Sequence, residues 1–109
     1  MSESAGFNGS SSEVQTGGGD AVTRVLEICN KRGLHARASA KFVQTVEKFE
    51  ADVRVRRGQE VVGGTSIMGL MMLGAGPGTT ITVEATGRQA NEVIEALAAL
   101  VSGRFTERD

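Results

Sequence analysis

The sequence has no tryptophan or tyrosine, and its 109 residues include one cysteine, one histidine and one proline. A single cysteine excludes an internal disulfide and suits a reducing cytosol, so we expect a cytoplasmic protein. We interpret Cys29 as a small buried apolar residue at a strand end. One cysteine and one histidine cannot form a zinc-ligand cluster. No run is long and apolar enough to cross a membrane, so we expect no membrane insertion.

Charge is nearly balanced, with 12 basic and 13 acidic residues. This balance, without interleaved aromatic residues, gives no support for nucleic-acid binding. Residues 1–20 are rich in glycine and serine and carry only acidic charge, so we expect a disordered tail before a single domain at residues 21–109. The domain then has 12 basic and 10 acidic residues, a formal charge of +2. Four basic residues surround the only histidine and suit an acidic or phosphorylated protein partner, although a merely solvated face is the alternative: Lys31, Arg32, Arg37 and Lys41.

Along residues 21–109, segments with the hydrophobic pattern of a strand alternate with segments that have the pattern of a helix. Segments with β-branched or alternating residues predict strands at residues 21–29, 52–57, 60–62 and 79–85. Helical spacing predicts helices at residues 36–49 and 66–73. Thr86 and Gln89 have the spacing of a capping box and are predicted to open a last helix, whose apolar stripe runs from Ala90 to Val101. The resulting order is βαββαβα, an α+β fold. We expect an open-faced β-sandwich in which three helices cover one face of a four-stranded antiparallel sheet.

The histidine lies in the stretch Gly33–Ala40, just before a predicted helix. A neutral imidazole is a nucleophile near neutral pH, and unpaired N–H groups at a helix start favour a negatively charged phosphoryl group. Arg37 adds a planar fork of donors that matches phosphate oxygens. This arrangement is suited to carrying a phosphoryl group on His35. A surface or capping histidine is the alternative interpretation.

Two blocks of sequence carry a resemblance to a known family. The stretch Gly33–Val43 resembles the active-site signature of the histidine-containing phosphocarrier protein (HPr) family of the bacterial phosphoenolpyruvate-dependent phosphotransferase system. Thr65–Gly74 resembles that family's regulatory serine and the helix after it. The blocks lie at the family's usual separation, and the resemblance covers about residues 21–103.

The resemblance implies a function and its partners. His35 matches the histidine that accepts a phosphoryl group on Nδ1 from phosphorylated enzyme I, with phosphoenolpyruvate as the ultimate donor, and passes it to IIA proteins of a sugar or nitrogen-related branch. Arg37 matches the arginine that helps to neutralise the phosphate. A carrier of this kind is expected to act as a monomer, without a bound cofactor or metal, and to have no independent turnover.

Ser66 matches the serine that a dedicated HPr kinase/phosphorylase modifies, so regulation by serine phosphorylation is a further expectation. The residue also stands where a helix N-cap belongs. A second hypothesis is a non-catalytic regulatory binding module read through the phosphorylation states of Ser66 and His35. A third is a small interaction domain with neither chemistry.

The helix predicted after Ser66 is apolar nearly all round, so part of it should be exposed and suited to docking several partners. The resemblance assigns partner binding to three residues beside His35, which are Ile67, Met68 and Met71. We add Lys41, which follows His35 closely in the sequence. We expect Leu70 and Leu73 to belong to the core.

One position departs from the family pattern. The family usually has proline after the arginine, where this chain has Ala38. Alanine is a good helix former, so we expect the helix to form with a less rigid start.

Overall fold

Residues 21–106 are described by the computed structural model, and the tail predicted for residues 1–20 lies outside them. The predicted order of elements is confirmed, with a single turn of 3-10 helix added after the last helix. The elements are β1 (Val22–Glu27), α1 (Ala36–Val46), β2 (Asp52–Arg57), β3 (Glu60–Gly63), α2 (Ile67–Met72), β4 (Thr80–Thr86), α3 (Ala90–Ser102) and η1 (Arg104–Thr106).

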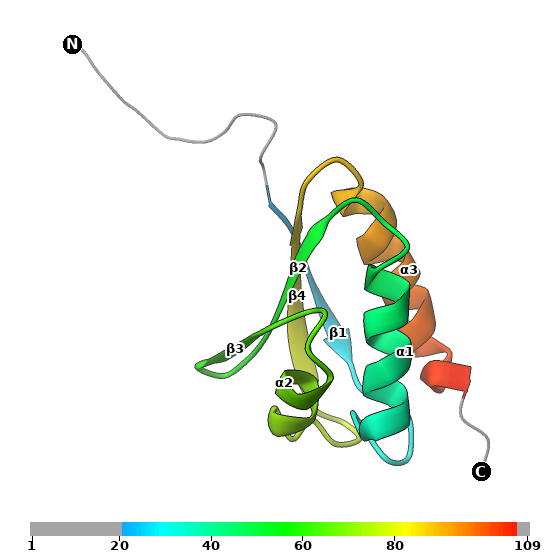
Figure 1. Ribbon diagram of the computed structural model, residues 1–109. Coiled ribbons are helices and arrows are strands. Elements are labelled where there is room, and N and C mark those ends of the chain that lie inside the picture. The colour runs from blue at the N-terminus through cyan, green and yellow to red at the C-terminus, as the bar shows by residue number, and fades with distance from the viewer. Residues whose placement is uncertain (1–20, 107–109) are drawn as a thin grey trace.

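The strands form one antiparallel sheet in the order β1-β4-β2-β3, so the first and last strands are neighbours. The side chains that alternate along β2 and β4 toward the helices are buried, among them Val53, Val55, Ile81 and Val83. The helices lie on one side of this sheet, with α1 and α3 next to each other (Figure 1). The structure therefore confirms the open-faced α+β sandwich.

The long helices contribute one apolar face each to the core. In α3 the predicted stripe is buried at Ala90, Val93, Ile94, Leu97 and Val101, and Leu100 is half-buried. Phe42 of α1 is fully buried. The helix α1 ends at Val46, earlier than predicted, because Lys48 and Phe49 donate to carbonyls three residues back and tighten the last turn.

Two local predictions are wrong. Thr86 and Gln89 do not form a capping box, because Thr86 still belongs to β4 and Gln89 accepts a hydrogen bond from the backbone N–H of Glu50 through Oε1, at 2.8 Å. Cys29 is exposed, because its neighbour Ile28 takes the inward position. The Cys29 thiol donates to the carbonyl of Val101 at 3.2 Å.

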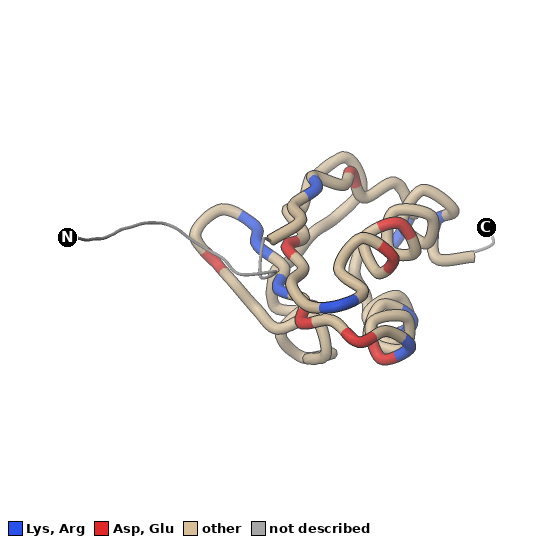
Figure 2. Tube along the Cα trace, turned by 90° about the horizontal axis from the view of Figure 1, so that it is seen from above, with Lys and Arg blue, Asp and Glu red and all other residues tan. Residues whose placement is uncertain are grey.

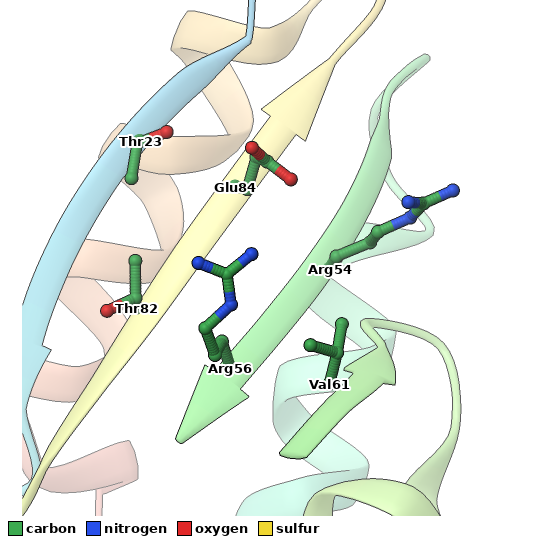
Figure 3. Close-up of a pocket in the computed structure, with 6 residues that line it drawn as sticks. All are labelled: Thr23, Arg54, Arg56, Val61, Thr82 and Glu84. Carbon is green, nitrogen blue, oxygen red and sulfur yellow. The ribbon is translucent and has the colours of Figure 1, made fainter. Parts of the chain in front are cut away.

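The other face of the sheet has no helix on it in the described part of the chain. A shallow pocket on this face is lined by threonine, charged and valine side chains (Figure 3): Thr23, Arg54, Arg56, Val61, Thr82 and Glu84. Basic and acidic residues are interspersed along the chain rather than gathered by sign (Figure 2). No predicted site residue lines this pocket.

Candidate functional site

The loop before α1 is held by hydrogen bonds and by one close approach. Gly33 has a positive φ of 66°, and a Cβ there would lie 2.3 Å from the carbonyl oxygen of Ala75. The next residue, Leu34, donates its N–H to that same carbonyl at 3.0 Å. Only glycine allows both the left-handed backbone and this contact. The path of the chain into His35 is therefore set by the loop that precedes β4.

Buried polar groups fix the same loop from inside. The Nδ2 group of Asn30 donates to the carbonyl of Gly33 at 2.8 Å, and Oγ of Ser39 donates to the carbonyl of Leu34 at 3.2 Å. Asn30 and Ser39 are both fully buried. Buried polar groups with hydrogen-bond partners hold one local conformation. His35 therefore follows a rigid support.

His35 is the N-cap of α1. Its backbone is extended, and Nδ1 accepts a hydrogen bond from the backbone N–H of Arg37 at 3.2 Å. The backbone carbonyl of His35 accepts from Ser39 at 2.9 Å, which begins the helix. An Nδ1 atom that accepts this bond presents its lone pair to the helix start. The imidazole is half-buried, so its exposed part faces solvent.

The four basic residues that surround His35 in the sequence differ in exposure. Lys31, Arg32 and Arg37 are exposed. Lys41 is half-buried, and its Nζ donates to the carbonyl of Phe105 at 2.8 Å and to Oγ1 of Thr106. The chain at η1 has three successive residues with positive φ, and Lys41 ties this unusual turn to α1. The sequence prediction missed this contact, because the turn has no glycine to signal a left-handed backbone.

Ser66 is the N-cap of α2, as predicted. Its Oγ accepts a hydrogen bond from the backbone N–H of Gly69 at 3.0 Å, and the residue is exposed. The helix starts of α1 and α2 lie toward the same end of the molecule (Figure 1), and the two helices are in contact. The structure therefore brings the two predicted phosphorylation sites to one end of the molecule.

The surface of α2 is apolar and partly exposed. Leu70 and Leu73 belong to the core, as predicted. The predicted docking residues have exposed fractions of 39% for Ile67, 70% for Met68 and 40% for Met71. Met72 is exposed to 72% and was missed by the sequence prediction, although its position four residues after Met68 places both on one helical row. The apolar surface of α2 is thus wider than predicted.

This arrangement offers a nucleophilic nitrogen and groups that bind anions. The backbone N–H groups of Ala36, Arg37 and Ala38 occupy the first turn of α1, where a helix provides no intrahelical acceptor. Together they favour a phosphoryl group. Ala38 is buried in an intact first turn, so the helix forms without the family's proline. Among residues 21–106, no group of three His, Cys, Asp or Glu side chains is placed to hold a metal ion. Of the helices these residues form, none has the length and apolar character needed to span a membrane.

Comparisons with known proteins agree on one family. The phosphocarrier protein HPr of Neisseria meningitidis is 50% identical over 82 residues, covering 75% of this chain and 92% of the relative. The phosphocarrier protein NPr of Shewanella violacea is 39% identical over 86 residues, covering 79% of this chain and 94% of the relative. The crystal structure of HPr-C-His from Thermoanaerobacter tengcongensis superposes with a TM-score of 0.76 at 40% identity, covering 81% of this chain and 99% of that one. A family model described as the phosphorylation site of the HPr component of the phosphotransferase system matches residues 22–103, and the chain therefore belongs to the HPr family of phosphocarrier proteins.

Proposed function

We propose that His35 accepts a phosphoryl group on Nδ1 from phosphorylated enzyme I and passes it to a IIA protein of a sugar or nitrogen-related phosphotransferase system. The observation that carries this proposal is the hydrogen bond from the N–H of Arg37 to Nδ1 of His35, at 3.2 Å. It supports a neutral imidazole whose Nδ1 lone pair, rather than a proton, faces the start of α1.

In the transfer step, the Nδ1 lone pair of His35 attacks phosphorus as the N–P bond to the donor histidine breaks. The donor imidazole leaves with the electron pair of that bond, so the transfer is an exchange between two histidines. The attacking Nδ1 gives up its hydrogen bond to the N–H of Arg37, which is then available to a phosphoryl oxygen. The protein contributes positioning and charge stabilisation, which are the main requirements of phosphoryl transfer.

Charge on the phosphorylated imidazole is stabilised by the first turn of α1 and by Arg37. The exposed guanidinium of Arg37 can approach phosphoryl oxygens from the solvent side. Each such interaction contributes about 0.3–1 kcal/mol when exposed. That is enough to favour the phosphoryl group without making it inert toward the next acceptor.

Partners dock on the apolar surface of α2 beside the helix start of α1. Ile67, Met68 and Met71 provide flexible apolar contacts that suit successive partners. Lys41 was predicted as a further docking residue. Its contacts with η1 favour a supporting role, although its half-exposed chain can still border a docked partner. We propose that the protein acts as a monomer in the cytoplasm, which leaves this surface open.

Ser66 is a proposed second phosphorylation site, modified by an HPr kinase/phosphorylase. Its exposed Oγ is accessible, and a phosphate there would meet the N–H of Gly69. This exposed N-cap is the observation that favours the second candidate function, a regulatory binding module read through the states of Ser66 and His35.

Incubation with phosphoenolpyruvate and purified enzyme I, followed by intact-mass measurement, tests the carrier function. We expect one added phosphate that is lost in acid, survives in base and is absent from His35→Ala. A folded protein that gains no such phosphate would contradict the carrier function. A Ser66-dependent interaction that persists in His35→Ala would then favour the binding module.

A further inference from the structure

Arg57 has a contact that the proposed function does not use. It is the last residue of β2, and the alternation that buries Val53 and Val55 turns its side chain toward the helices. Its Nη1 atom donates a hydrogen bond to the backbone carbonyl of Leu73 at 3.0 Å, and the residue is half-buried. This contact joins the sheet to the end of α2.

Leu73 is the C-cap of α2, where backbone carbonyls lack N–H donors within the helix. A guanidinium is a suitable donor there, because it provides both hydrogen bonds and positive charge. Within α2 only Leu70 is buried, so the six-residue helix has little packing of its own to fix its direction. Arg57 anchors the end of this helix, while Ser66 caps its start.

The chain leads directly from Leu73 to the support of His35. Two residues later, the carbonyl of Ala75 accepts the N–H of Leu34 at 3.0 Å. Leu34 is buried and immediately precedes His35. The hydrogen bond of Arg57 is thus separated from the loop of the reactive histidine by one short segment, whose two ends, Leu73 and Ala75, are buried.

We propose that Arg57 is a positioning residue that fixes the docking surface of α2 relative to His35. This inference rests on the proposed function, since it concerns how a partner bound to α2 reaches the imidazole. A partner that contacts α1 and α2 together binds best when the two are already correctly placed. Arg57 provides this preorganisation without touching the phosphoryl group.

The kinetic test compares Arg57→Met with Arg56→Met, using the full chain as the substrate of phosphorylated enzyme I. Arg56 is the preceding residue of β2 and projects over the open face of the sheet (Figure 3). Both substitutions remove one positive charge and keep a long side chain. We expect Arg57→Met to raise KM about three- to tenfold, the range for loss of one hydrogen bond. We expect kcat to stay within about twofold, because a docked partner restores the geometry. Arg56→Met should leave both constants unchanged, and Arg57→Lys should give an intermediate KM.

Amide hydrogen exchange provides a readout that does not depend on phosphoryl transfer. We expect Arg57→Met to speed exchange at the N–H of Leu34, whereas exchange at Val83 in β4 stays slow in both variants. Unchanged exchange at Leu34 would overturn the inference, as would an equal rise in KM for Arg56→Met, which indicates lost charge attraction. A fall in the kcat of Arg57→Met in proportion to the fraction of unfolded protein would also overturn it. If the unaltered protein takes no phosphate from enzyme I, the proposed function fails, and the positioning role fails with it even where Leu34 exchange responds.

Discussion

The starts of α1 and α2 use the same device in different surroundings. At each, a side chain caps the helix by accepting a backbone N–H: Nδ1 of His35 from Arg37 at 3.2 Å, and Oγ of Ser66 from Gly69 at 3.0 Å. His35 is half-buried and follows a loop held by buried groups, whereas Ser66 is exposed and precedes a helix with one buried residue. One cap follows a loop held by buried side chains, and the other is fully on the surface. This difference suits the proposed roles, in which His35 reacts in a fixed geometry and Ser66 is accessible to modification.

Replacement of the two caps should separate their roles completely. We expect His35→Ala to abolish the acid-labile phosphate acquired from enzyme I, because the attacking nitrogen is gone. Ser66→Ala should retain this phosphate at full stoichiometry, because the start of α1 is unchanged. Intact mass before and after acid treatment measures both outcomes. Acid-labile phosphate on His35→Ala would remove the distinction between the sites.

The rigidity of the loop before His35 can be tested by replacing two glycines, one in that loop and one outside it. Gly33 and Gly74 have similar φ values of 66° and 64°, but a Cβ at Gly74 has no atom within 4 Å. We expect Gly74→Ala to cost about 1 kcal/mol through backbone strain alone. Gly33→Ala should cost about 3 kcal/mol or more, because it adds a clash with the carbonyl of Ala75. Urea unfolding of both variants measures the difference, and equal losses would contradict a tightly held loop.

The docking role of α2 can be tested against an equally exposed apolar residue elsewhere. We expect Met68→Glu to raise the KM for enzyme I about tenfold, equivalent to about 1.4 kcal/mol, because it places a charge within the apolar surface. Val25→Glu on the open sheet face is the control, since Val25 is exposed to 61% against 70% for Met68. Equal effects from the two substitutions would place the docking surface elsewhere or extend it over the sheet.

Loss of the exposed cap should cost less stability than disruption of the His35 loop. We expect Ser66→Ala to lower the free energy of unfolding by about 1 kcal/mol, because the N–H of Gly69 loses its acceptor. Ser66→Asp should recover most of that loss, because aspartate also caps helices and suits the positive end of one. Thermal unfolding of the three proteins tests this order. A Ser66→Asp variant less stable than Ser66→Ala would argue against a phosphate being tolerated there.

Loss of a surface ion pair far from both caps should change the stability of the protein least. Arg24 and Glu95 lie 2.7 Å apart between β1 and α3, and the hydrogen bond from Arg24 lowers the pKa of the Glu95 carboxyl. A lowered pKa adds stability above the ordinary pKa of the carboxyl, and the gain is lost as pH falls through the folded-state value. We therefore expect Glu95→Gln to be slightly less stable near pH 7 and equal to the unaltered protein in acid. Solvent screening keeps the change small. Thermal unfolding across pH measures it, and a difference that persists in acid would point to lost packing instead.

Local patterns were sufficient to predict most of the elements. The alternation of valine and arginine in β2 gave both ends of that strand correctly, because side-chain direction in a strand has a period of two. The apolar stripe of α3 and the capping serine of α2 were also correct. His35 was chosen from its place before a predicted helix beside Arg37, and the family signature supported that choice. The choice of Ser66 as a phosphorylation site depended on the family signature, and the chemical roles of both residues stay predictions.

What local patterns could not predict depends on contacts between distant segments. The contact of Gly33 with Ala75, and that of Arg57 with Leu73, exist only because the sheet brings these segments together. Gln89 failed as half of a capping box because Glu50, distant in the sequence, provides a competing N–H. Lys41 was predicted to be a surface charge because the residues around it in the sequence give no sign of its contact with the turn at Phe105. In each case a tertiary partner decided between locally equal alternatives.

The pairing of β1 with β4 has a consequence for synthesis of the protein. On the ribosome, the histidine leaves the exit tunnel before part of the support of its loop, because Ala75, Gly78 and Thr79 come later in the chain. Because the first strand must wait for the last, such long-range pairing also slows folding. A nascent chain that ends before Ala75 therefore has the loop of His35 without this part of its support. The complete support of the His35 loop therefore forms only after most of the domain has been made.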